Sequence, residues 1–94
     1  MLRLSEETWI VASKQQVSCG LSGEAAILNL RNGVYYGLDP VGARIWNLIQ
    51  EPRTFAQVRD IVLREYEVEA PRLESDMHEL FAQLAAHQLI EFST

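Results

Sequence analysis

The stretch that decides the fold is NGVYYGLDPVGARIWNLI, which runs from Asn32 to Ile49. Asn-Gly is the dipeptide that best tolerates two positive φ angles, so Asn32-Gly33 predicts the two-residue turn of a β-hairpin. The aromatic run that follows, residues 34–38, predicts a short strand. Asp39-Pro40 is typical of a helix start, because the aspartate can accept from free backbone N–H groups and proline pre-sets the first φ angle. We therefore expect sheet before this stretch and helix after it.

Further strands are expected upstream. Thr8–Ala12 is β-branched and aromatic, and Gln16–Cys19 either extends this strand or forms its return. A turn over Gly20–Gly23 follows, and residues 24–30 then alternate between two faces. One face is wholly apolar and is expected to cover the core; it carries Ala26, Leu28 and Leu30. With residues 34–38, these segments predict a small antiparallel meander of about three strands.

Three helices are predicted downstream, where apolar residues recur at helical spacing. The first follows Asp39-Pro40 and stops at Glu51-Pro52. The second begins after Thr54, because Thr54-Phe55-Ala56-Gln57 fits a capping box. The third and longest begins near Pro71 and ends near Gln88, and residues 89–92 predict an extended segment that folds back on the domain. The fold class is therefore α+β: a three-stranded antiparallel meander followed by three helices, similar in outline to a winged helix-turn-helix.

Size and composition are those of one ordinary globular domain. The 94 residues are 48% hydrophobic and 22% charged, which predicts a single domain over 1–94 with an ordered core of about 8–92. The net charge of −5 argues against a general binder of polyanions. No apolar run suits a membrane span or a signal peptide, and the single cysteine, Cys19, suits a reducing compartment. We expect a cytoplasmic protein without a membrane partner.

The titratable residues offer little catalytic chemistry. His78 and His87 are nine positions apart, on opposite faces of the predicted third helix, so they cannot form a metal pair. Cys19 could pair with either histidine as a nucleophile, but no surrounding motif supports that alternative. The glycines lack the spacing of a phosphate-binding loop. We therefore expect no metal, no cofactor and no enzymatic activity.

A winged-helix outline suggests DNA, so the predicted third helix was tested as a recognition helix. Its first half carries Glu74, Asp76 and Glu79, and phosphate repels such a face. Nucleic acid is therefore not an expected partner. Arginines on the predicted second helix and just before it keep a winged-helix DNA-binding protein as the alternative function: Arg53, Arg59 and Arg64.

The strand over residues 34–38 is the last of the meander and is expected at an edge of the sheet. Its unpaired backbone groups could accept an added strand, with Tyr35 or Tyr36 and the third helix forming apolar pockets. The two tyrosines point to opposite faces, and the sequence leaves open which one lines a pocket. Simple core packing of both, or docking of a structural partner subunit at this edge, are the other interpretations.

The run from Gly33 to Trp46, the helix started by Thr54 and the closing Leu-Ile-Glu resemble the PqqD-like family. These small peptide chaperones, also called RiPP recognition elements, serve the biosynthesis of ribosomally made, post-translationally modified peptides. The resemblance covers about Thr8 to Phe92 and is greatest to the stand-alone leader-binding proteins of lasso-peptide clusters.

The resemblance implies a non-catalytic adaptor. Such a protein binds the leader segment of a precursor peptide as an antiparallel strand added to its third strand. It then delivers the precursor to a modifying enzyme or to a separate leader peptidase with a cysteine nucleophile. Carried onto this sequence, the implied peptide-binding residues are Val34, Tyr35, Tyr36, Gly37 and Leu38 on the strand, and Leu73, Asp76, Met77, Leu80 and Leu84 on the third helix.

Overall fold

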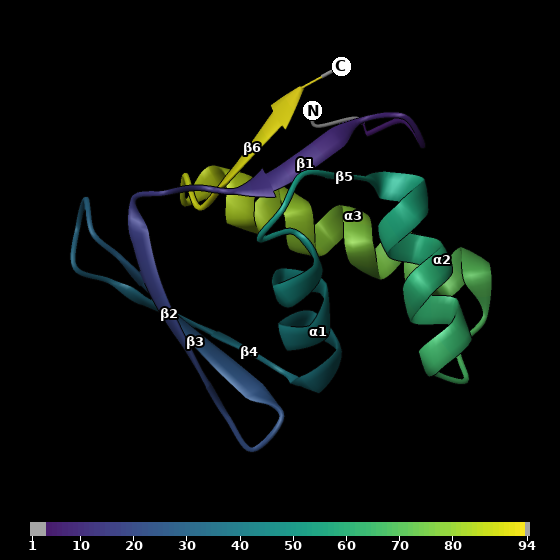
Figure 1. The fold of residues 1–94 in the computed structure, drawn as a ribbon, viewed down its shortest axis with the longest axis horizontal. Helices are drawn as coiled ribbons and strands as arrows, with labels where there is room; N and C mark the ends of the chain where they lie inside the picture. The colour runs from purple at the N-terminus through teal and green to yellow at the C-terminus, as the bar shows by residue number, and fades with distance from the viewer. Residues whose placement is uncertain (1–3, 94) are drawn as a thin grey trace.

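Two short antiparallel sheets and three helices make up residues 4–93, the part of the chain that the computed structural model describes (Figure 1). The strands are β1 (Trp9–Ala12), β2 (Gln16–Leu21), β3 (Glu24–Asn29), β4 (Tyr35–Leu38), β5 (Arg53–Thr54) and β6 (Ile90–Ser93). The helices are α1 (Pro40–Leu48), α2 (Phe55–Glu65) and α3 (Ala70–Ala86). None of these helices is both long and apolar enough to cross a membrane.

The predicted meander is confirmed as the sheet β2-β3-β4. Gln16–Leu21 is a separate strand and does not extend the first one. β1 leaves the meander for a second sheet, ordered β5-β1-β6. The predicted C-terminal segment does fold back on the domain, because β6 pairs antiparallel with β1 from Trp9–Ser93 to Ala12–Ile90.

The predicted two-residue turn at Asn32-Gly33 is wrong. Asn29 pairs with Val34, so residues 30–33 form a longer loop in which only Gly33 has a positive φ, of 72°. The Asn29 side chain starts this bend early, because its Oδ1 accepts from the backbone N–H of Arg31 at 2.9 Å. The two-residue turn lies instead between β2 and β3, where Ser22 and Gly23 both have positive φ.

The predicted core face of β3 is also wrong. Ile27 is fully buried and Asn29 is 4% exposed, whereas Leu30 is 52% exposed. The predicted alternation along the strand is confirmed, but the opposite face covers the core. Asn29 can occupy that face because its amide makes hydrogen bonds in the interior, including one from Nδ2 to the His87 carbonyl at 2.7 Å.

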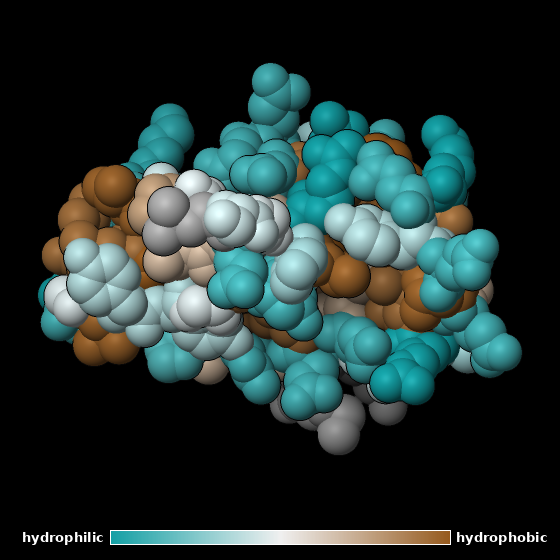
Figure 2. Space-filling model, turned by 90° about the horizontal axis from the view of Figure 1, so that it is seen from below, coloured by the Kyte–Doolittle hydropathy of each residue, from teal (hydrophilic) through white to brown (hydrophobic). Residues whose placement is uncertain are grey.

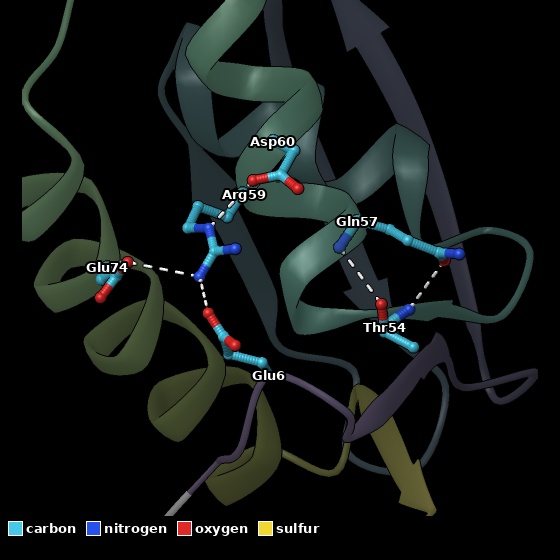
Figure 3. Close-up of polar contacts among 6 residues, drawn as sticks. All are labelled: Glu6, Thr54, Gln57, Arg59, Asp60 and Glu74. Atoms are coloured by element: carbon cyan, nitrogen blue, oxygen red, sulfur yellow. Dashed lines mark hydrogen bonds and ion pairs between the residues drawn. The ribbon is translucent and has the colours of Figure 1, made fainter.

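The helix starts are confirmed. The Asp39 carboxylate accepts from the Gly42 N–H at 2.7 Å, and Pro40 occupies the first turn of α1. At the start of α2, the Thr54 hydroxyl accepts from the Gln57 N–H and the Gln57 side chain accepts from the Thr54 N–H, which is a complete capping box (Figure 3). These caps set where the chain turns from β4 into α1 and from β5 into α2.

One core joins the sheets and the helices. Trp46 of α1 and Phe81 of α3 are its largest fully buried side chains. Ile10 of β1 and Ile27 of β3 reach it from the two sheets and are also fully buried. The meander therefore packs one of its faces against the helices, as the sequence predicted, although that face is not the predicted one.

Arg59 of α2 connects three parts of the chain (Figure 3). Its guanidinium contacts the Glu6 carboxylate, Asp60 Oδ1 at 3.1 Å and Glu74 Oε1 on α3 at 3.4 Å. Its side chain is 15% exposed, and its hydrogen bonds to Glu6 and then to Asp60 raise its pKa above the usual value. Arg59 therefore holds α2, α3 and the segment before β1 together.

Replacing Arg59 by glutamine should lower the free energy of unfolding by about 1–2 kcal/mol. A network of ion pairs around a mostly buried arginine stabilises the fold more than a single exposed pair does. The control is Arg44→Gln, which breaks a more exposed pair with Glu65 and should cost at most about 1 kcal/mol. Urea denaturation measures both. Equal losses in the two variants would contradict the role of Arg59.

Candidate functional site

A cavity lies between β4 and α3, and we call it the β4–α3 cleft. Its volume is about 580 Å³. Tyr36, Gly37 and Leu38 line it from β4, and Leu73, Asp76 and Leu80 from α3. The remaining lining residues are Asp39, Val41, Gly42 and Ile45 at α1, and Tyr66, Glu67 and Val68 between α2 and α3.

β4 is an outer strand beside this cleft. It pairs with β3 on one side only. In an antiparallel ladder, hydrogen-bonded and non-hydrogen-bonded pairs alternate, and the Asn29 N–H donates to the Val34 carbonyl at 2.9 Å. Two residues further on, Tyr36 is again bonded to β3. The N–H and C=O groups of Tyr35 and Gly37 therefore face the open edge.

The two tyrosines of β4 have different surroundings. Tyr36 is half-buried and lines the cleft, and Ile27, its partner on β3, is fully buried in the core. Tyr35 is 69% exposed and pairs with Leu28 on the opposite face of the sheet. Tyr36 is therefore the tyrosine whose side chain faces the cleft.

The cleft is closed at the C-terminal end of α3. The Tyr36 hydroxyl donates to Gln83 Oε1, and its ring lies 5.3 Å from that of His87, centroid to centroid. Asn29 donates to the His87 carbonyl, and Arg31 Nη1 donates to Gln88 Oε1 at 2.8 Å. These contacts tie the β3–β4 loop to α3 while the middle of α3 stays apart from β4.

The Tyr36 hydroxyl is a proton donor at neutral pH. Its partial burial, and then the nearby negative charge of Glu79, raise its pKa above the usual value near 10. The phenol therefore stays protonated and can donate to Gln83. Tyr36 acts as a neutral hydrogen-bonding side chain rather than as an acid or base.

The structure brings together six of the ten residues implied by the resemblance: Tyr36, Gly37, Leu38, Leu73, Asp76 and Leu80. Met77 and Leu84 are fully buried in the core and do not line the cleft. Val34 and Tyr35 lie outside it, half or more exposed. Met77 and Leu84 therefore support α3 from beneath, and the backbone of Tyr35 reaches the open edge.

Sequence reasoning missed the inner side of the cleft. Val41 and Ile45 are one helical turn apart on α1 and face the cavity, and Val68 closes it from the α2–α3 connection. The i, i+4 spacing of Val41 and Ile45 directly after the Asp39 cap was a usable signal. Nothing local distinguished Val68 from an ordinary apolar residue of a connecting segment.

Apolar side chains are also exposed on the outer side of the meander. Val17, Leu28 and Tyr35 are directly opposite one another on β2, β3 and β4, and Val17 is 58% exposed. Leu30, two positions after Leu28 at the start of the β3–β4 loop, is also exposed. Figure 2 shows hydrophobic residues gathered at the left end, on the side where Figure 1 places that loop.

The described residues contain no group of three or more histidine, cysteine, aspartate or glutamate side chains that could hold a metal ion. Cys19 is exposed on β2, and no histidine lines the cavity of about 370 Å³ beside it.

The site is thus the open edge of a strand beside an apolar cleft, on a small domain with a three-stranded meander and three helices. The family model described as "Coenzyme PQQ synthesis protein D (PqqD)" matches residues 24–90. This match covers most of the chain, and the chain belongs to the PqqD family, as its resemblance predicted.

A solved structure agrees with this assignment. The chain is similar to the protein in "TbiB1 in Complex with the TbiA(beta) Leader Peptide", with 36% sequence identity and a TM-score of 0.80. The match covers 86% of this chain and 94% of that one. No curated protein sequence matches significantly.

Replacing Asn29 by alanine should lower the free energy of unfolding by about 1–3 kcal/mol, because the His87 carbonyl and the Arg31 N–H both lose a hydrogen-bonding partner. The control is Asn47→Ala at an exposed position of α1, which should change stability little. Urea denaturation measures both variants. If the Asn29 variant is as stable as its control, the tie between β3 and α3 contributes nothing to the fold.

Proposed function

We propose that this protein is a non-catalytic adaptor that binds the leader segment of a ribosomally made precursor peptide. The leader would add to β4 as an antiparallel strand and place apolar side chains in the β4–α3 cleft. The observation that carries the proposal is the open edge of β4 directly beside this cleft. The relative TbiB1, solved with a leader peptide, supports it.

Strand addition at this edge specifies a register. The peptide would exchange backbone hydrogen bonds with Tyr35 and Gly37, whose groups face outward. Peptide residues opposite Tyr36 and Leu38 would share the face of those residues and enter the cleft. The peptide's two cleft-facing side chains would therefore be two positions apart.

The energetics require both kinds of contact. Backbone hydrogen bonds contribute only about 0.5–1.5 kcal/mol each, whereas association costs about 4–15 kcal/mol. Two apolar side chains buried in the cleft would add about 1.5–3 kcal/mol each. The edge would thus set the position and direction of the peptide, and the cleft would supply much of the affinity.

The proposed partner enzyme is a modifying enzyme or, if the pathway makes lasso peptides, a separate leader peptidase with a cysteine nucleophile. An adaptor needs no catalytic set of its own, and no histidine lines the cavity beside the exposed Cys19. The single cysteine also suits the reducing cytoplasm, where we place the protein. A short precursor gene beside peptidase and cyclase genes would support this assignment.

Replacing Gly37 by proline should weaken leader binding at least about tenfold, because proline removes an outward N–H and places its ring where the peptide would lie. The matched control is Gly37→Ala. A Cβ at this position meets no atom within 4 Å and the backbone φ is not positive, so alanine should fit. Fluorescence anisotropy measures binding of the labelled TbiA(beta) leader peptide, the peptide in the complex of the relative TbiB1. Equal affinity of the two variants would exclude strand addition at β4.

Replacing Leu80 by serine should weaken binding about tenfold, because the side chain lines the cleft and about 1.4 kcal/mol of lost apolar burial is tenfold in affinity. Tyr35→Ala is the control, since that side chain lies on the other face of the sheet and its backbone is retained. The same anisotropy assay applies, with thermal melts to confirm folding. A greater loss of affinity for Tyr35→Ala than for Leu80→Ser would show that the peptide's apolar contacts lie on the outer face of the meander.

A further inference from the structure

The β4–α3 cleft has an acidic rim. Asp39, Glu67 and Asp76 line it, and Glu79 lies beside Asp76 in an adjoining hollow of about 190 Å³ that Leu80 and Gln83 complete. Among residues 4–93, no lysine, arginine or histidine lines either space. The rim is therefore negative throughout.

Acidic residues elsewhere on the helices have close cationic partners. Asp60 and Glu74 share Arg59, and Glu65 accepts two hydrogen bonds from Arg44 at 2.8 Å. In the cleft, Asp76 has only Arg72 at 4.0 Å, and both side chains are largely exposed, at 65% and 81%. Within the described residues, Glu67 and Glu79 form no ion pair at all. The negative charge of the rim is thus left largely unneutralised.

The acidic rim is combined with apolar surface on one face of α3. Glu79 and Leu80 follow Asp76 by three and four positions, and Gln83 follows them by four and three, so all four residues share one side of α3 and face the adjoining hollow. A lysine or arginine side chain can lie along an apolar residue such as Leu80 with its methylene groups, while its charged end reaches a carboxylate. An acidic peptide side chain would be repelled at the same place.

We propose that the cleft selects extended peptide segments with lysine or arginine beside their apolar residues, the cationic groups lying against Asp76 and Glu79. This rests on the proposed function and names the chemical class of the peptide. Backbone hydrogen bonds to β4 do not distinguish one peptide sequence from another. The acidic rim would add a preference for peptides with cationic side chains. It also speeds the approach of a cationic segment to a protein of net charge −5.

The test uses a phage-displayed library of random twelve-residue peptides, selected on the wild-type protein and on the double variant Asp76→Asn/Glu79→Gln. Glu51→Gln/Glu91→Gln is the matched control, because both residues are exposed, lie outside the cleft and change the net charge equally. Gly37→Pro is the control for loss of strand addition. Circular dichroism checks that each variant is folded.

The expected result is that wild type and the Glu51/Glu91 control enrich peptides with two apolar residues two positions apart and lysine or arginine nearby. The Asp76/Glu79 variant should retain the apolar preference and lose the basic one. Selected basic peptides, made synthetically, should bind this variant about two- to tenfold more weakly, and high salt should remove the difference.

Three results would overturn the inference. If wild type enriched peptides that have two apolar residues but no lysine or arginine, the charge preference would be rejected and the proposed leader binding would not be affected. If wild type enriched no more peptides than the Gly37→Pro variant does, both strand addition at β4 and the charge preference would be rejected. A loss equal in the Glu51/Glu91 control would show that net charge, rather than the rim, attracts the peptide.

Discussion

The hydrogen bond from the Asn29 amide to the His87 carbonyl is the contact on which the arrangement of the site depends. It joins residues 58 positions apart and holds the end of β3 against the end of α3. Tyr36 and Arg31 reinforce it through Gln83 and Gln88. Since these contacts lie at one end, the sheet and helix are fixed there and enclose a cleft further along α3. The free edge of β4 borders that cleft.

The second sheet lies away from β4 and leaves the outer edge of the meander unpaired. β1, β5 and β6 gather the two ends of the described chain on the other side of the core, with Ile10 fully buried there. No strand from this sheet lies against β4. An outer strand is ordinarily a risk for aggregation, and short length is one natural protection. β4 has only four residues and is followed at once by the Asp39 cap, so little edge is exposed.

Local signals predicted the parts of the fold that depend on neighbouring residues. The Asp39 and Thr54 caps were found because a cap uses N–H groups within three residues. The strand over residues 34–38, the three helices and the returning tail followed from periodicity and turn residues. Six of the ten implied peptide-binding residues also line the cleft. Three of them are on α3, where helical spacing places Leu73, Asp76 and Leu80 on one side.

The errors arise mainly from contacts between segments that are distant in the sequence. Asn32-Gly33 has the better turn sequence, but the Asn29 side chain bonds to Arg31 and His87 and moves the bend. That contact also decides which face of β3 is buried, so the more apolar face with Leu28 and Leu30 remains outside. β5 has two residues and no pattern of its own, and it exists because β1 lies beside it.

The division of roles between edge and cleft has a consequence for recognition. Backbone hydrogen bonds place a peptide without regard to its sequence, so discrimination must come from the side chains that enter the cleft and pass its rim. The apolar lining accepts aliphatic residues of several shapes, since a methylene more or less changes affinity by only about 1 kcal/mol. Charge discriminates in a different way, because an acidic peptide residue is repelled by the rim and gains nothing from the lining. A cleft with an apolar interior and a negative rim would therefore accept apolar side chains of several sizes and reject peptides that carry a negative charge at the rim.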